Sequence, residues 1–374
     1  MNRLVLACVA VAALVGAIVL GWFEVRQGRD FRRLLAAGDA ALAQDQTSAA
    51  IEAFSGAIAL RRDSMLGWLK RGDTYHRTGD FGSALRDLEQ ANRLDPDAPR
   101  PMELLGDVND ALGHHARAIE YYSRFLTIDD RAPRILYKLA LAHYRGGNAS
   151  TASDIVKKAL ALDRQFAEAY YLLGICERDT RRPDDAAASF RRALVVNPTF
   201  APAREELAAL ESGRGRRREG LEQLEALAAL QPSAERLVDV ADAYARAGRV
   251  DSAAATLARG AERYPSSPVV YESLARFWLD AAEAQRDQVA TRNASMAIDG
   301  VAERDPQSSE LPLLRGRIQL LTGDAPGAER SLQAATTTLP VNPAAFRYLA
   351  DAAARLGHRD VARLAQARYA ALAP

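Results

Sequence analysis

Small residues recur along this chain every 34 positions, and no other feature of the sequence restricts the fold as strongly. The phase continues to the end of the chain once one residue is lost near Ser233 and about seven are gained between Trp278 and Ala294. The phased positions are Gly38, Gly72, Gly106, Ala140, Gly174, Ala208, Ala241, Ala275, Gly316 and Ala350. A second set follows twelve positions downstream, allowing for the insertion, at Ala50, Ala84, Ala118, Ala152, Ala186, Gly220, Ala253, Ala294, Ala328 and Ala362. A period of this length is typical of a solenoid of stacked repeats.

The segment from Met65 to Ala98 shows what one repeat contains. Its apolar and small residues fall at helical spacing on both sides of a break at Thr78-Gly79-Asp80, and Pro96 closes the segment. This pattern predicts two antiparallel helices followed by a stop. Neither helix has an apolar stripe wide enough to bury itself, so each pair needs a similar pair on both sides.

The same segment resembles the tetratricopeptide repeat. The residues that carry the resemblance are Trp68, Gly72, Tyr75, Ala84, Leu88, Ala91 and Pro96. The closing proline is replaced by Arg62, Asp130 and Arg164 in the first, third and fourth units. The resemblance covers everything after the N-terminal segment, and it implies an all-α, right-handed superhelix (an α-solenoid) of about ten helix-turn-helix repeats.

We therefore expect an N-terminal anchor and short linker over residues 1–30 and a solenoid over 31–374. The expected repeats are 31–64, 65–98, 99–132, 133–166, 167–200, 201–233, 234–267, 268–308, 309–342 and 343–374. The insertion at 279–293 is amphipathic and helix-forming, and it is expected to lengthen both helices of its repeat by about one turn.

The resemblance also places a binding surface, because the family's first helices line a concave groove. Mapped onto the third repeat, the groove positions hold Glu103, Asp107 and Asp110, which gives an acidic stretch. The fourth and fifth repeats differ, since their groove positions combine aromatic and aliphatic residues with three cations, as a site for a protein segment requires. These candidate partner-binding residues are Tyr137, Lys138, Leu141, Tyr144, Arg145, Tyr171, Leu172, Ile175 and Arg178.

The N-terminus carries an apolar run from Leu4 to Phe23 that is long enough to cross a bilayer core of about 30 Å. It predicts a single-pass inner-membrane anchor, and a signal peptide cleaved near Val15-Gly16-Ala17 is the alternative. The arginines that follow the run favour a cytoplasmic solenoid, whereas Arg3 before it favours a periplasmic one. Partners that are themselves membrane-associated complexes are then expected.

The remaining sequence points away from catalysis. A formal net charge of +1 provides no global field for nucleic acid, and no phosphate-binding loop, nucleophile elbow or zinc motif is present. His114-His115 lacks further ligands at metal spacing, so we expect no metal, cofactor or small-molecule substrate. The sequence therefore predicts a non-enzymatic, membrane-tethered scaffold that holds a protein segment. The alternative is a subunit that contacts anionic polymer or lipid through arginine-rich turns at Arg181-Arg182 and Arg214 to Arg218.

Overall fold

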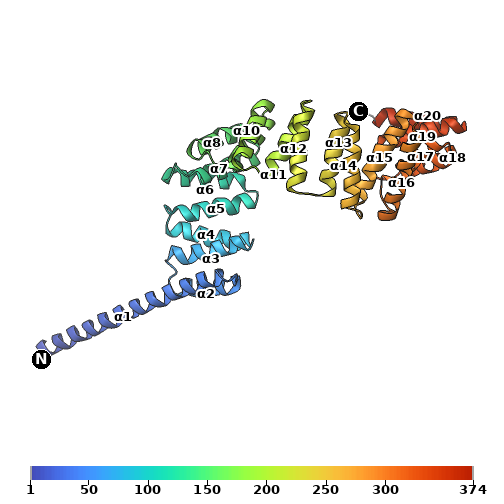
Figure 1. Ribbon diagram of the computed structural model, residues 1–374. Coiled ribbons are helices and arrows are strands. Elements are labelled where there is room, and N and C mark those ends of the chain that lie inside the picture. The colour runs from blue at the N-terminus through green and yellow to red at the C-terminus, as the bar shows by residue number, and fades with distance from the viewer. Residues whose placement is uncertain (1, 373–374) are drawn as a thin grey trace. The chain divides into compact units, whose positions relative to one another are not determined.

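The computed structural model describes the backbone of residues 2–372 and the side chains of residues 14–17 and 19–372. The described chain is entirely helical, with twenty α-helices and no β-strand (Figure 1). This confirms the predicted all-α solenoid of paired helices. The chain divides into two compact units, residues 1–198 and 199–374, each of which is a run of helix pairs.

The first unit contains ten helices in five consecutive pairs. They are α1 (Asn2–Leu42), α2 (Thr47–Leu60), α3 (Met65–Arg77), α4 (Phe81–Leu94), α5 (Pro99–Ala111), α6 (His115–Ile128), α7 (Pro133–Arg145), α8 (Ala149–Leu162), α9 (Ala167–Asp179) and α10 (Pro183–Val196). Each helix packs on the next along the chain. The first helices of successive pairs are also in contact, for example α5 with α7 and α7 with α9.

The second unit repeats this arrangement with ten further helices. They are α11 (Ala201–Gly213), α12 (Arg217–Leu230), α13 (Ala234–Arg246), α14 (Val250–Arg263), α15 (Pro268–Gln285), α16 (Gln288–Arg304), α17 (Leu311–Thr322), α18 (Ala325–Ala335), α19 (Pro343–Leu356) and α20 (Arg359–Leu372). Helices α15 and α16 have 18 and 17 residues, whereas α13 and α14 have 13 and 14. The insertion therefore lengthens both helices of its pair, as predicted.

The phased small residues lie where the two helices of a pair cross. All of them are buried except Ala350 and Ala362, which are partly exposed. These two belong to α19 and α20, the last pair of the described chain, on which no further pair packs. Where the first helix has a glycine, the second helix presses a bulky side chain onto it: a Cβ built on Gly72 would lie 2.8 Å from Leu88, and one on Gly174 would lie 2.5 Å from Phe190. Where the first helix has Ala140, its partner is the smaller Val156. A small residue on the first helix thus makes room for a larger side chain of the second helix at these crossings.

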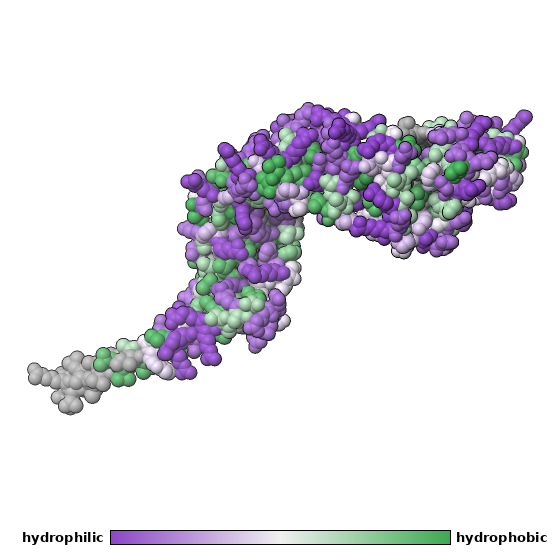
Figure 2. Space-filling view, viewed as in Figure 1, coloured by the Kyte–Doolittle hydropathy of each residue, from purple (hydrophilic) through white to green (hydrophobic). Residues whose placement is uncertain are grey.

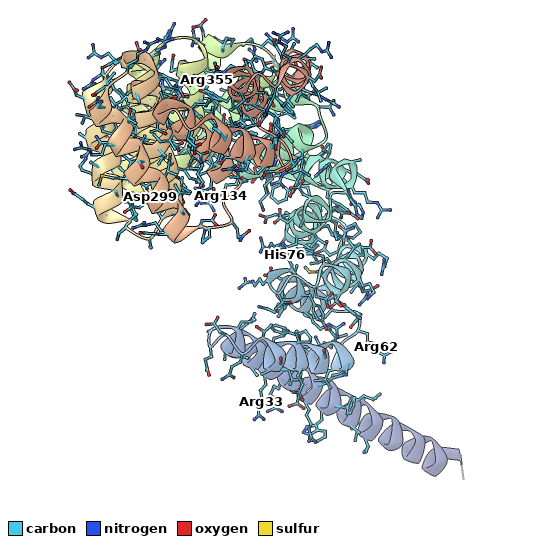
Figure 3. All side chains as sticks on the ribbon, turned by 90° about the vertical axis from the view of Figure 1, so that its right-hand side faces the viewer. Arg33, Arg62, His76, Arg134, Asp299 and Arg355 are labelled. Atoms are coloured by element: carbon cyan, nitrogen blue, oxygen red, sulfur yellow. The ribbon has the colours of Figure 1, made fainter. Side chains whose placement is uncertain are left out.

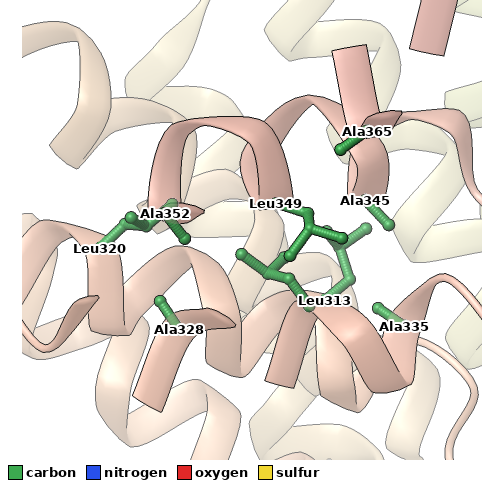
Figure 4. Close-up of a cluster of buried hydrophobic side chains, with 9 residues drawn as sticks. Leu313, Leu320, Ala328, Ala335, Ala345, Leu349, Ala352 and Ala365 are labelled. Atoms are coloured by element: carbon green, nitrogen blue, oxygen red, sulfur yellow. The ribbon is translucent and has the colours of Figure 1, made fainter. Parts of the chain in front are cut away.

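Packing between pairs forms a chain of small cores instead of one central core. In the last two pairs, leucines of α17 and α19 interleave with alanines of α18, α19 and α20 (Figure 4). The members include Leu313, Leu320, Ala328, Ala335, Ala345, Leu349, Ala352 and Ala365. Similar clusters recur at other junctions, such as that joining α7, α8 and α9. Stability in such a fold comes mainly from contacts between neighbours.

The turn inside each pair uses one residue in the left-handed conformation. Glycine occupies this place in seven pairs, for example Gly79 with φ 78° and Gly113 with φ 77°. Glycine adopts this conformation without the steric cost that a Cβ brings. Asp45, Arg181 and Arg286 adopt it in the other three pairs, with φ between 52° and 60°. The break at Thr78-Gly79-Asp80 is this turn, and Asp80 then caps α4 by accepting a hydrogen bond from the Ser83 N–H.

The predicted membrane anchor is wrong on the evidence of the described residues. None of the helices they form is both long enough and apolar enough to span a bilayer. Much of the predicted run from Leu4 to Phe23 has side chains outside the described set.

Helix α1 also continues without a break where a linker was expected. Its described apolar part gives way to a charged stretch toward α2 (Figure 2), and its last turns carry Phe31 and Leu35, both 7% exposed, into the core of the first pair. The predictions of a single-pass inner-membrane location and of attachment to a membrane through this helix are withdrawn with the anchor.

Candidate protein-binding surface

The side chains of α5 and α7 that the sequence assigned to a groove are joined by ion pairs. The Lys138 ammonium of α7 lies 2.7 Å from a Glu103 carboxylate oxygen and 2.8 Å from one of Asp107, both on α5. Asp107 also accepts a hydrogen bond of 2.7 Å from the Tyr122 hydroxyl of α6. The acidic third repeat and the cationic fourth repeat therefore neutralise each other, because their first helices are adjacent.

A second set of contacts continues this pattern at the other end of the same helices. Arg145 of α7 pairs with Asp110 of α5, which is also 2.9 Å from the His115 Nδ1. Tyr144 donates a 2.9 Å hydrogen bond to Asp179 of α9. Burial and this hydrogen bond raise the pKa of Tyr144 to about 12, so its hydroxyl stays protonated at neutral pH. All three first helices are thus connected by polar contacts.

Equivalent pairs occur earlier in the same unit. Lys70 of α3 lies 2.7 Å from Asp39 of α1, and Arg100 of α5 lies 3.7 Å from Asp73 of α3. We call the pairs Asp39–Lys70, Asp73–Arg100, Glu103/Asp107–Lys138 and Asp110–Arg145 the charge ladder. Each rung is partly exposed to solvent, and such pairs contribute little to stability individually. Their main effect is to fix which charges remain available on this face.

Tyr137 stands beside an open pocket. Its ring packs against Phe166 with 4.9 Å between centroids, and burial together with the nearby Glu168 raises the pKa of Tyr137. The pocket has a volume of ≈ 480 Å³ and lies between the start of α7 and the loop that leads into α9. Its lining consists of Arg134, Tyr137, Lys138, Asp163, Gln165, Phe166 and Glu168. Arg134, the second residue of α7, is labelled in Figure 3. A pocket of this size suits one bulky side chain or a short segment.

The other predicted groove residues divide into reachable and buried ones. Leu172 and Ile175 of α9 are only 3% and 6% exposed, so they contribute to the core and not to a binding surface. Leu141 is half-buried against the core that joins α7, α8 and α9. Tyr171 is half-buried, with its ring 5.9 Å from that of Phe190, and Arg178 donates to Asp179 at 2.9 Å.

Sequence reasoning missed part of the pocket wall. Asp163, Gln165 and Phe166 lie in the loop between repeats, and the family mapping considers only positions within first helices. The signal that could have found them is the missing proline of the fourth repeat, because Arg164 stands in its place and the loop has more freedom there. Arg134 and Glu168 are each the second residue of a first helix, so they were within reach of the mapping.

Other sequence candidates contribute no site. The described residues contain no cluster of three or more side chains suited to a metal ion. The His115 Nδ1 atom already lies 2.9 Å from a carboxylate oxygen of Asp110. The arginine-rich turns carry their own carboxylates. Arg216 lies 3.5 Å from Glu211, and Arg218 lies 3.1 Å from Glu222. No observation on these turns favours an anionic polymer or lipid as ligand.

Comparisons with known proteins agree with the repeat pattern. A family model described as tetratricopeptide repeat matches residues 35–99, 69–133 and 137–203, and a second model with that description matches 234–277. The small glutamine-rich tetratricopeptide repeat-containing protein 2 of Mycosarcoma maydis is 30% identical over 97 residues. That alignment spans 26% of this chain and 28% of the relative, so only about a quarter of either protein is matched.

Two solved structures illustrate the structural likeness. The C-terminal part of a TPR repeat-containing protein from Cytophaga hutchinsonii is 16% identical, with a TM-score of 0.51 over 76% of this chain and 98% of that chain. PilF of Pseudomonas aeruginosa is 20% identical, with a TM-score of 0.45 over 56% of this chain and 95% of that chain. The first of these shows a common fold. Because the family models together match more than half of the residues, the chain belongs to the tetratricopeptide repeat family.

Proposed function

We propose that this protein is a scaffold for protein–protein interaction that holds a segment of a partner protein against α5, α7 and α9. The observation that carries the proposal is the ≈ 480 Å³ pocket beside Tyr137, because its lining includes two of the predicted residues, Tyr137 and Lys138. The reachable candidates farther along α7 and α9 are Tyr144, Arg145, Tyr171 and Arg178.

The charge ladder determines what kind of segment this surface favours. Lys138 and Arg145 already pair with carboxylates of α5, so a partner that relied on them would have to displace those contacts. Tyrosine rings need no such exchange, and they bury a large area at a low cost in side-chain entropy. The surface therefore favours a segment with bulky apolar or aromatic side chains over a highly charged one.

Site-specific photo-crosslinking tests the proposal in the full chain. A benzophenone amino acid at Arg134 should give adducts with a protein in extracts of the organism that makes this chain. The matched control carries it at Asp154, an exposed residue on α8. Equal adducts from both positions would place the partner elsewhere.

Two further measurements separate recognition from folding and from charge. Tyr137→Ala should abolish the adduct while Tyr137→Phe retains it, and circular dichroism must show the same helix content in both variants. Raising salt from about 50 mM to about 500 mM should leave the yield nearly unchanged, whereas phosphate-driven binding to the arginine-rich turns would decline steeply.

A further inference from the structure

A second pocket opens between the third and fourth helix pairs, on residues that the groove does not use. It has a volume of ≈ 520 Å³, and its apolar wall is formed by Leu126 of α6, Leu136 and Leu139 of α7, and Ile155 of α8. Leu136 and Leu139 are each 7% exposed, while Leu126 and Ile155 are partly exposed. We call this the inter-repeat pocket.

The chain itself shows what fills the equivalent space two repeats earlier. Trp68 lies 68 residues before Leu136 at the same repeat position, and its indole N–H donates a 2.9 Å hydrogen bond to the Arg62 carbonyl. Arg62, labelled in Figure 3, lies in the α2–α3 loop and is the repeat equivalent of Asp130, which lines the inter-repeat pocket. In the second repeat Trp68 thus closes the notch against the preceding loop together with Arg71, whose guanidinium lies 5.2 Å from the centre of the indole. In the fourth repeat Leu136 is too short to reach the loop, and Leu139 takes the place of Arg71.

The rim of the inter-repeat pocket adds a charge preference. Arg131 and Lys158 line it, and both side chains are exposed without an ion-pair partner among the described residues. Asp130 is the one carboxylate of the lining, so the rim carries a net positive charge. This differs from the groove, where Lys138 and Arg145 of α7 are already paired with carboxylates of α5.

We propose that the inter-repeat pocket binds an aromatic side chain from a protein partner, with a neighbouring carboxylate of that partner on Lys158 or Arg131. The aromatic ring takes the place that Trp68 occupies from within the chain in the second repeat, and a tryptophan can also donate to the Asp130 carbonyl. The proposal rests on the scaffold function only in taking a protein as the ligand, since its residues are not those of the groove.

A short peptide provides the probe, so the test needs no identified partner. Acetyl-Gly-Glu-Trp-Glu-Gly-amide is titrated into the full chain carrying ¹³C-labelled leucine methyl groups. The methyl resonances of Leu126, Leu136 and Leu162, all in the pocket lining, should shift with a Kd on the order of 1 mM. The versions with lysine in place of glutamate, or alanine in place of tryptophan, should bind at least about tenfold more weakly.

Variants identify the site. Leu136→Trp should fill the pocket as Trp68 does and abolish the shifts. If Leu136→Trp does not fold, Leu162→Glu replaces it as the test, because Leu162 is 42% exposed and lines the same pocket. This substitution should weaken peptide binding about tenfold. Lys158→Glu should weaken it similarly, whereas Lys157→Glu, at the exposed residue before it and outside the lining, should not. No methyl shift at about 5 mM peptide, equal binding of the lysine peptide, or equal effects of the two lysine variants would overturn the proposal.

Discussion

Gly174→Ala is the sharpest test of how the helices of a pair pack. A Cβ at Gly174 would lie 2.5, 2.7 and 3.0 Å from three atoms of the Phe190 ring, where ordinary contact begins at 3.4 Å. Phe190 is fully buried, so the ring has nowhere to move. Overpacking of this kind costs about 1–3 kcal/mol, and alanine recovers up to about 1 kcal/mol of helix propensity. We therefore expect a net loss of up to about 2 kcal/mol in the free energy of unfolding.

Two comparisons isolate the ring as the cause. Gly28→Ala is the matched control in α1, because its Cβ would meet only the mobile end of Arg61 at 3.4 Å, and it should stabilise by up to about 1 kcal/mol. In a Phe190→Val background, which reproduces the natural Ala140–Val156 pair, Gly174→Ala should no longer be destabilising. The two substitutions should therefore couple by about 1–3 kcal/mol.

Native-state hydrogen exchange of the α9 and α10 amides is the assay, because repeat arrays open in parts and a global melt averages over them. If Gly174→Ala costs the same with valine at position 190 as with phenylalanine, the packing argument is refuted.

Three other measurements follow from the structure. Arg181→Gly should stabilise the α9–α10 turn by about 0.5–1 kcal/mol, because it replaces a non-glycine residue in the left-handed conformation. Gly147→Ala should destabilise the α7–α8 turn by about 1 kcal/mol for the converse reason. Hydrogen exchange of the amides at each turn measures both effects. Burial raises the pKa of Glu103, but Lys138 and Arg100 lower it by more, so the pKa in the folded state is below that in the unfolded state. The stabilisation from Glu103 is therefore present above the unfolded pKa and lost as pH falls through the folded pKa. In Lys138→Gln, carbon NMR of the Glu103 carboxyl should show a higher titration midpoint. Burial raises the pKa of the Cys176 thiol to about 12. In the Cys8→Ala variant, iodoacetamide at pH 8 should therefore label Cys176 at least about a hundredfold more slowly in the native chain than in the unfolded chain. Comparable rates would show that the thiol is accessible.

The repeat phase was readable from sequence because it is a steric requirement. Gly72 and its equivalents must be small wherever Leu88 or a larger side chain covers them, and that constraint recurs at a fixed step. The identity of the covering side chain was less apparent, because the repeating pattern consists of small residues and does not show which leucine or aromatic side chain covers each glycine. The N-terminal anchor was inferred from hydropathy alone, which does not register how α1 continues into the first pair.

The candidate site was less predictable because availability depends on neighbours. Lys138 has the position of a groove cation, but Glu103 and Asp107 lie one repeat earlier at the matching height and take its charge. Leu172 and Ile175 also occupy groove positions, yet α9 is apolar on more than one face and both side chains are buried. The inter-repeat pocket was invisible for a related reason, since it results from the shortness of Leu136 and not from any recognisable motif.

The charge ladder also constrains how this protein can change length. If residues 99–132 were lost, Asp73 would come to face Lys138, in the same relation as Asp39 to Lys70, and that rung would re-form. Loss of residues 133–166 would instead bring Asp107 to Leu172 and Asp110 to Asp179, so that both carboxylates of α5 lose the cations of α7. Deletion of a whole repeat is therefore tolerable at one junction and penalised at the next, so the order of these modules is itself encoded in their electrostatics.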